Sequence, residues 1–161
     1  MTQEEKSLLL QDLCGRLPYG VIVRHADPLI DNDGNETGEF WHKRGYLCDV
    51  TTLDDMTTTI IESEGSDEEG YEHICFLERT LPYLRPMSSM TEEEKKELLQ
   101  ISNFISDIDD DFIYLIERAL IDIVDIVNFI SWLNAHHFDY RNLIERGLAI
   151  EVTEENNPYK E

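Results

Sequence analysis

Between residues 132 and 141 the sequence gathers side chains that are common in active sites. They are an indole, two adjacent imidazoles, a carboxylate, a phenol and a guanidinium, in the order Trp132, His136, His137, Asp139, Tyr140 and Arg141. An imidazole close to a carboxylate and a guanidinium can transfer a proton while a charged substrate group is held nearby. We therefore take these six residues as the candidate functional surface.

The same stretch also fits the end of a helix. His136 and His137 are adjacent, so on a helix they project about 100° apart and do not easily share one ligand. Trp132 lies one turn before His136 and so contacts it on the same face. Asp139 is placed to cap a following short helix that Gly147 ends. We therefore predict that helix termination and packing explain the histidines. For the whole chain we expect no catalytic residue, no cofactor and no metal site.

Two other groups of residues have the chemistry of metal ligands. His73 and Cys75 are two positions apart and so lie on one side of a predicted strand. His42 and Cys48 are also an even number of positions apart and would lie on one side of their own strand. A Cys₂His₂ zinc site is therefore one alternative, and a buried thiol beside surface imidazoles is the other. Asp31, Asp33 and Glu36 offer carboxylates in a predicted turn, where a weak cation site competes with a plain polar turn. An EF-hand is excluded, because aligning Gly34 with the loop's invariant glycine puts Leu29 and Phe40 where carboxylates are required. Motifs of nucleotide-binding proteins, zinc proteases and serine hydrolases do not occur in the sequence.

The elements that must position these residues divide residues 1–161, taken as a single domain, into a region 1–90 and a region 91–161. Thr2 and Glu5 have the spacing of a capping box and predict a first helix that Gly15 and Pro18 end. Runs rich in β-branched residues then predict strands near 19–25, 45–53, 57–63 and 71–77, with a further strand after the loop at 31–39. We expect a small antiparallel sheet, with a partly closed barrel as the alternative.

The second region is predicted to be helical. Thr91 and Glu94 repeat the capping-box spacing, so a helix begins near residue 91. Residues 112–133 are apolar nearly all round a helix and predict a long buried helix, through which we expect a homodimer. The fold class is therefore α+β, with a helical C-terminal region that follows the sheet.

The charge of the chain limits its partners. Its 161 residues include 13 lysines and arginines against 35 aspartates and glutamates, a net charge of −22. Such a surface repels phosphate backbones and anionic lipid, so we expect no direct binding of nucleic acid or membrane and favour a basic protein partner. Acidic residues inside the 112–133 run argue against a transmembrane helix, and three scattered cysteines without a secretory signal indicate the cytoplasm.

Two segments carry a resemblance to a known group of proteins. LPYLRPMSSMTEEE at 81–94 and WLNAHHFDYRNLIERGLAIE at 132–151 resemble the most recognisable segments of an uncharacterised family from prophage and mobile-element regions of gut anaerobes. The resemblance implies a small cytoplasmic protein with a variable β-rich first part and a helical end. It implies no activity and no catalytic residue, since none is established for that family.

These observations favour a non-enzymatic interaction protein of phage or mobile-element origin that binds a host or phage protein. One alternative is an acidic nucleic-acid mimic that inhibits a DNA-binding protein. Another is an enzyme whose site lies near His136, Asp139 and Arg141, which a concave pocket at that helix end would favour.

Overall fold

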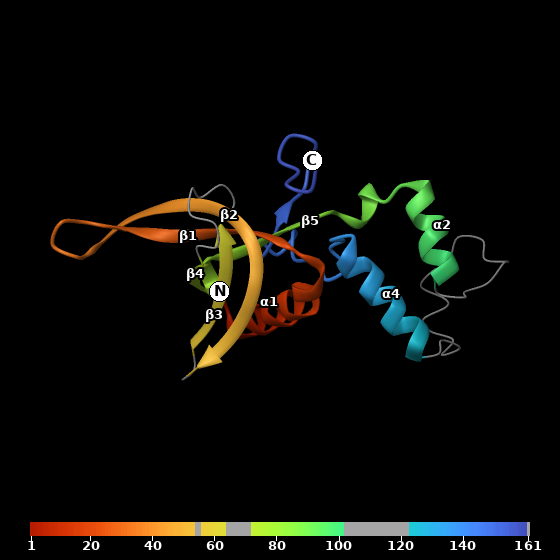
Figure 1. Cartoon of the computed structure of the whole chain (residues 1–161), viewed down its shortest axis with the longest axis horizontal. Coiled ribbons are helices and arrows are strands. Elements are labelled where there is room, and N and C mark those ends of the chain that lie inside the picture. Colours follow the sequence, from red (N-terminus) through yellow and green to blue (C-terminus); the bar gives the residue numbers. More distant parts are fainter. Residues whose placement is uncertain (54–55, 64–71, 102–122, 161) are drawn as a thin grey trace.

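The computed structural model describes residues 1–53, 56–63, 72–101 and 123–160. Three α-helices and six strands make up the secondary structure of these residues (Figure 1). In chain order they are α1 (Gln3–Arg16), β1 (Ile22–Ile30), β2 (Glu36–Leu53), β3 (Met56–Ser63), β4 (Glu72–Phe76), β5 (Thr80–Leu84), α2 (Glu92–Ile101), α4 (Ile123–Ala135) and β6 (Ile150–Glu151). Short 3₁₀ turns occupy Leu17–Tyr19, Leu77–Arg79 and Met87–Ser89.

The first helix begins where the sequence predicts. The hydroxyl of Thr2 accepts a hydrogen bond from the backbone N–H of Glu5, and the Glu5 carboxylate accepts one from the N–H of Thr2. Leu9 and Leu13 lie one turn apart and are fully buried against the sheet. The predicted capping box and first helix are therefore confirmed.

The six strands form one sheet in the order β4-β3-β2-β1-β5-β6. Neighbouring strands from β4 to β5 run antiparallel, but β6 pairs with β5 in parallel, through Tyr83 with Ile150 and Leu84 with Glu151. The expectation of an antiparallel sheet is thus wrong in this respect, because β6 returns from the distant C-terminal segment and not through a hairpin.

The sheet is strongly curled without closing into a barrel. Thr59 on β3 and Thr80 on β5 are separated by two strands in the sheet, yet their hydroxyl oxygens lie 2.8 Å apart. The strand order still begins at β4 and ends at β6, since no ladder joins the two ends among the described residues. The alternative of a partly closed barrel is therefore wrong, and an open, curled sheet replaces it.

The curl is concentrated in β2, which merges two predicted strands into one long arch (Figure 1). At Gly45 the neighbouring strand β3 comes so close that a Cβ atom would collide with the backbone of Glu62 and the side chain of Ile61. The register then shifts between Leu47 and Asp49, so Cys48 lies in a β-bulge. A glycine at a close approach and a bulge are two devices that bend a strand.

The distal part of the β1–β2 hairpin extends away from the rest of the molecule (Figure 1). Every residue from 30 to 44 is exposed, including the large side chains of Ile30, Phe40 and Trp41. We call residues 30–44 the arm.

The chain buries two clusters of apolar side chains. The larger one lies between the concave face of the sheet, α1 and the segment 143–149, and includes Val23, Leu47 and Ile61. The smaller one joins α2 to the end of α4 and contains Leu98, Trp132, Leu133 and Phe138.

The expected long apolar helix at 112–133 is not part of the observed fold. Residues 112–122 lie outside the described residues, and the helix that the structure describes is α4, which ends at Ala135. Ile126 and Val127 on α4 are 42% and 56% exposed. The described part of the run is therefore not buried on all sides, and the prediction of a central buried helix is corrected.

Candidate functional site

The segment from Trp132 to Arg141 begins with the last turn of α4 and leaves the helix through a defined C-terminal motif. The N–H of Phe138 donates to the carbonyl of Leu133 at 2.9 Å, and the N–H of His137 donates to the carbonyl of Asn134 at 3.1 Å. His137 has a φ of 59°, the left-handed conformation that this pair of hydrogen bonds requires. The arrangement is a Schellman motif, in which His137 occupies the position where glycine is usual.

Both histidines of the pair stack on aromatic rings, and they do so on different partners. The His136 ring stacks on Trp132 with centroids 3.9 Å apart, and its Nδ1 lies 2.9 Å from the Trp132 carbonyl oxygen. The His137 ring stacks on Tyr159 with centroids 4.0 Å apart. The predicted contact between Trp132 and His136 is confirmed, and the two imidazoles do not converge on one point.

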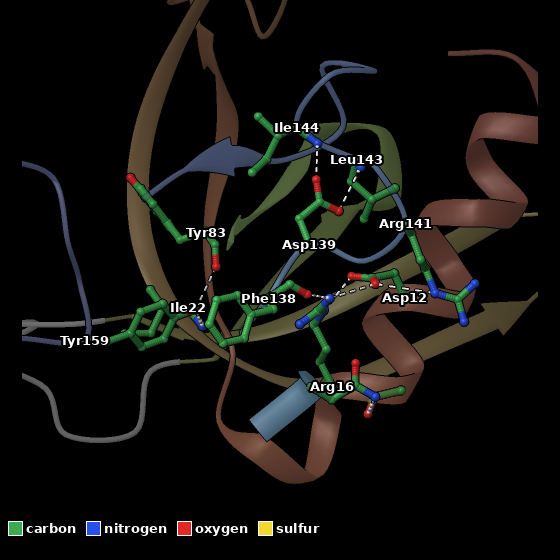
Figure 2. Close-up of polar contacts among 12 residues, drawn as sticks. Asp12, Arg16, Ile22, Tyr83, Phe138, Asp139, Arg141, Leu143, Ile144 and Tyr159 are labelled. Carbon is green, nitrogen blue, oxygen red and sulfur yellow. Dashed lines mark hydrogen bonds and ion pairs between the residues drawn. The ribbon is translucent and has the colours of Figure 1, made fainter. Parts of the chain in front are cut away.

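His137 is uncharged at neutral pH. Burial lowers the pKa of its imidazole from 6.5 to about 4, and the positive charges of Arg16, His136 and Arg85 lower it further in the same direction. Tyr159 is held by two hydrogen bonds, since its hydroxyl donates to the Tyr83 carbonyl at 2.9 Å and accepts from the Ile22 N–H at 3.2 Å (Figure 2). Burial raises the pKa of this phenol above its usual range. The stacked pair is therefore neutral.

Asp139 uses both carboxylate oxygens to bind the backbone. They accept hydrogen bonds from the N–H groups of Leu143 and Ile144, each at 2.9 Å (Figure 2). The segment that follows is a series of turns, not the predicted short helix, and it reverses at Gly147, whose φ is 69°. Asp139 caps this turn as predicted, although no helix follows.

A buried ion pair lies directly beneath this segment. Arg16 and Asp12 on α1 are both fully buried, with Nε–Oδ2 and Nη2–Oδ1 distances of 2.7 and 3.0 Å (Figure 2). Arg16 also donates to the carbonyl of Phe138 at 2.8 Å, and Arg141 approaches Asp12 to 3.6 Å. Arg16 and Arg141 flank the ring of Tyr140, at 5.6 and 5.2 Å from its centroid. The candidate residues of this segment thus contact α1, the C-terminal tail and the local backbone.

The two segments that carry the family resemblance pack against each other. Arg85 donates its N–H to the carbonyl of His137 and accepts from the N–H of Asp139, each at 2.8 Å. Its guanidinium lies 4.2 Å from the centroid of the Phe138 ring and binds Glu94 through two hydrogen bonds of 2.7 and 3.0 Å. Arg85 therefore joins the residue 81–94 segment to the residue 132–151 segment.

Among the described residues, the structure does not bring together the four side chains of the alternative zinc site, His42, Cys48, His73 and Cys75. Cys75 is buried, whereas Cys48 and His42 are exposed, and Cys48 lies in the bulge that breaks the parity of β2. The side chain of His73 lies outside the described residues. At the tip of the arm, Asp31 Oδ1 accepts from the N–H groups of Asp33 and Asn35, each at 2.9 Å, which is the polar-turn alternative.

Cys75 instead belongs to a cluster that sequence reasoning missed. Its Sγ lies 3.1 Å from Nδ1 of His25 and 3.4 Å from Oδ1 of Asp27, and those two atoms are 3.7 Å apart. Within the described ranges, these three side chains form a group able to hold a metal ion. His25 and Asp27 are two positions apart on β1, so their side chains point to the same face of the sheet, and the sequence alone could have shown that they are neighbours. Cys75 is brought to them only by the curl of the sheet.

The geometry of this cluster does not suit a thiolate nucleophile. Burial raises the pKa of the Cys75 thiol to about 12, and the negative charge of Asp27 raises it further. Asp27 approaches the same imidazole nitrogen as the thiol, whereas a catalytic triad needs the carboxylate on the opposite nitrogen. The thiol is therefore protonated and inert as it stands.

The arm carries the most exposed aromatic side chain of the described chain. Trp41 is 61% exposed and Ile30 is 54% exposed. Phe40 is anchored from below by Arg79, whose guanidinium lies 5.2 Å from the Phe40 ring centroid and 3.4 Å from the carboxylate of Glu36. Arg79 thus contacts the β2 strand of the arm at Phe40 and Glu36, while the turn at residues 31–35 is exposed.

No protein-family model, curated protein or solved structure matches this chain. None of the described helices has the length and apolar character that a membrane crossing requires.

Proposed function

We propose that this chain is an interaction protein that binds a basic protein surface through the arm. The observation that supports the proposal most strongly is the continuous exposure of residues 30–44, with Trp41 61% exposed on the β2 strand of the ribbon, opposite Asp27 of β1. Exposed tryptophan is enriched among the residues that dominate protein interfaces, because it buries a large rigid surface at a small entropic cost.

The charge of the arm indicates the chemistry of the partner. The arm contains four exposed carboxylates, Asp31, Asp33, Glu36 and Glu39, and two basic residues at its β2 end, Lys43 and Arg44, so its formal charge is 2 − 4 = −2. The molecule as a whole carries −22. A basic surface would be attracted over a long range and aligned along the arm, and a shallow apolar pocket in that surface would receive Trp41.

The arm is also rigid enough to present these residues. Asp31 organises the turn through its side chain, the N–H of Asp31 donates to the Asn35 carbonyl at 2.9 Å, and the Thr37 hydroxyl donates to the Leu29 carbonyl at 3.1 Å. Hydrogen bonds donated by the backbone N–H groups of the turn, that of Asn35 above all, lower the pKa of the Asp31 carboxyl, which therefore stays ionised at neutral pH. A pre-organised loop loses less conformational entropy when it binds.

Photo-crosslinking tests this proposal. A photoreactive phenylalanine derivative replaces Trp41 in one version of the protein and Leu99 in the other, because Leu99 on α2 is similarly exposed at 51%. In extracts of the encoding cell we expect a discrete adduct with a basic protein from position 41 and none from position 99. An identical adduct pattern at both positions, or no adduct at position 41, contradicts the proposal.

The predictions about the origin and the oligomeric state of the protein belong to the same proposal. Origin from a phage or mobile element and a homodimer through residues 112–133 remain predictions. If the captured protein binds DNA and this chain competes with DNA for it, the partner class is that of the nucleic-acid-mimic alternative. For an enzyme near His136, Asp139 and Arg141 the contacts of these residues give no support, because each is engaged with protein groups.

A further inference from the structure

At the base of the arm, the side chains of His25, Asp27 and Cys75 present three different ligand atoms to one small volume. His25 and Asp27 come from β1 and Cys75 comes from β4, two strands that share no ladder in the described sheet. His25 is fully buried and Cys75 is 4% exposed, while the side chain of Asp27 is 34% exposed. One side of the cluster is therefore closed by the protein and the Asp27 side is accessible to solvent.

The distances in the cluster are close to those of ligands around one ion. Zinc bonds of about 2.3 Å to sulfur and about 2.0 to 2.2 Å to nitrogen or oxygen, at tetrahedral angles, separate the ligand atoms by about 3.4 to 3.6 Å. The observed separations are 3.1, 3.4 and 3.7 Å. From this geometry we propose that His25 Nδ1, Asp27 Oδ1 and Cys75 Sγ bind a Zn²⁺ ion, with water as the fourth ligand on the Asp27 side.

The ligand types select the metal. Thiolate and imidazole favour borderline transition-metal ions such as Zn²⁺, whereas Mg²⁺ and Ca²⁺ prefer sites made of oxygen ligands. A thiolate and a carboxylate also balance the two positive charges of the ion. When the ion binds, the Cys75 thiol releases its proton to solvent and a sulfur–zinc bond replaces the S–H bond.

A small adjustment of the three side chains would accommodate the ion. Nδ1 of His25 and Oδ1 of Asp27 lie 3.7 Å apart, about 0.3 Å more than the tetrahedral separation of a nitrogen and an oxygen ligand. The nearest pair, Nδ1 and Sγ, has to separate by only about 0.5 Å to reach the tetrahedral value.

The proposed site would fix the curl of the sheet and the base of the arm. It would join β1 to β4 across the concave face, beside the Thr59–Thr80 contact. This inference does not depend on the proposed function, because it concerns metal binding by the free protein.

Cobalt spectroscopy on the full chain tests the site. The protein is treated with chelator and reductant, and Co²⁺ is added as the spectroscopic probe for Zn²⁺. We expect one Co²⁺ per chain, with visible bands of a tetrahedral ion and a thiolate charge-transfer band, both lost when Zn²⁺ displaces the probe. Cys75→Ser should lose the charge-transfer band, and Asp27→Asn should weaken metal binding by at least about tenfold.

Cys48→Ser is the matched control, because the Cys48 thiol is exposed in the bulge and outside the cluster, and its spectrum should equal that of the wild type. If circular dichroism shows that Cys75→Ser is unfolded, Asp27→Asn decides the question, since its side chain is partly exposed. Absence of the charge-transfer band in the wild type at saturating Co²⁺ overturns the proposal. So does its loss in Cys48→Ser, or unchanged affinity in Asp27→Asn.

Discussion

His137 is held between the end of α4 and the ring of Tyr159, in a backbone conformation that few side chains adopt readily. The burial of its imidazole makes the stability of the fold depend on pH. The folded-state pKa of about 4 lies below the ordinary value of 6.5, so the unfolded chain binds a proton at a pH where the folded chain does not. Stability from this residue is therefore complete above pH 6.5 and is lost as the pH falls toward 4.

We predict that His137→Asn makes the free energy of unfolding less sensitive to acid over this interval. Asparagine tolerates the left-handed conformation and does not titrate. For the wild type the loss from His137 amounts to as much as about 3 kcal/mol between pH 6.5 and 4. Urea unfolding at several pH values measures it, with the exposed His42→Asn as control. Equal pH slopes for wild type and His137→Asn would contradict the assignment.

The buried pair of Asp12 and Arg16 gives the second prediction at this scale. Asp12→Ala should lower the free energy of unfolding by about 3 to 5 kcal/mol, because it leaves the Arg16 charge buried without its carboxylate. Glu92→Ala removes an exposed i,i+3 partner of Lys95, and solvent screens that ion pair, so the free energy of unfolding should change much less than in Asp12→Ala. Chemical denaturation of both variants compares them, and similar losses would show that the buried pair is not stabilising.

Much of the candidate segment could be predicted at the level of single residues, because its contacts are local. The stacking of Trp132 on His136 follows from helical spacing, and the Asp139 cap follows from a carboxylate just after a helix end. The cluster of His25, Asp27 and Cys75 was missed because Cys75 is fifty positions from His25 in sequence. Only the tertiary curl of the sheet brings them together.

At the scale of elements, the arch of β2 determines the shape of the sheet, and Gly45 determines where β2 can approach β3. We predict that Gly45→Ala lowers the free energy of unfolding by at least about 2 kcal/mol, because the added methyl group meets the backbone of Glu62 and that backbone cannot move away easily.

Gly15→Ala is the matched control for this prediction. It adds the same methyl group within α1, where the nearest neighbour is the side-chain nitrogen of Asn134 at 3.3 Å, and it should be neutral or stabilising through helix propensity. Thermal unfolding followed by circular dichroism compares the two variants. A Gly45→Ala protein as stable as Gly15→Ala would mean that β2 and β3 can separate at this point.

The elements also show where the sequence was a sufficient guide. The capping boxes at Thr2 and Thr91 depend on residues three positions apart, and both are present in the structure. The parallel pairing of β6 with β5 joins residues 150–151 to residues 83–84, and no short-range pattern encodes it. Local signals thus gave the ends of elements, while strand order and direction depended on long-range packing.

At the scale of the whole molecule, net charge is the dominant property. With −22 on 161 residues, like charges repel one another in the compact state, and salt screens them with a Debye length of about 10 Å at 0.1 M. We predict that the melting temperature rises when sodium chloride is increased from low to moderate concentration. Sucrose at equal osmolality is the control for non-ionic effects, and a flat or falling melting temperature in salt would show that the acidic groups are compensated within the fold.

The same charge is part of the interaction surface in the proposed function, and the arm is the place where it can be tested. The most direct measurement is the affinity of the partner crosslinked at position 41, titrated as purified protein against wild type, Trp41→Ala and Leu99→Ala at two salt concentrations. We expect Trp41→Ala to weaken binding by at least about thirtyfold, corresponding to a hot-spot loss of about 2 kcal/mol, and Leu99→Ala to leave it unchanged. Higher salt should weaken binding by the wild type, since the carboxylates of the arm meet a basic surface. Equal affinity of wild type and Trp41→Ala, or binding that does not respond to salt, would contradict the proposal that the arm recognises a basic protein.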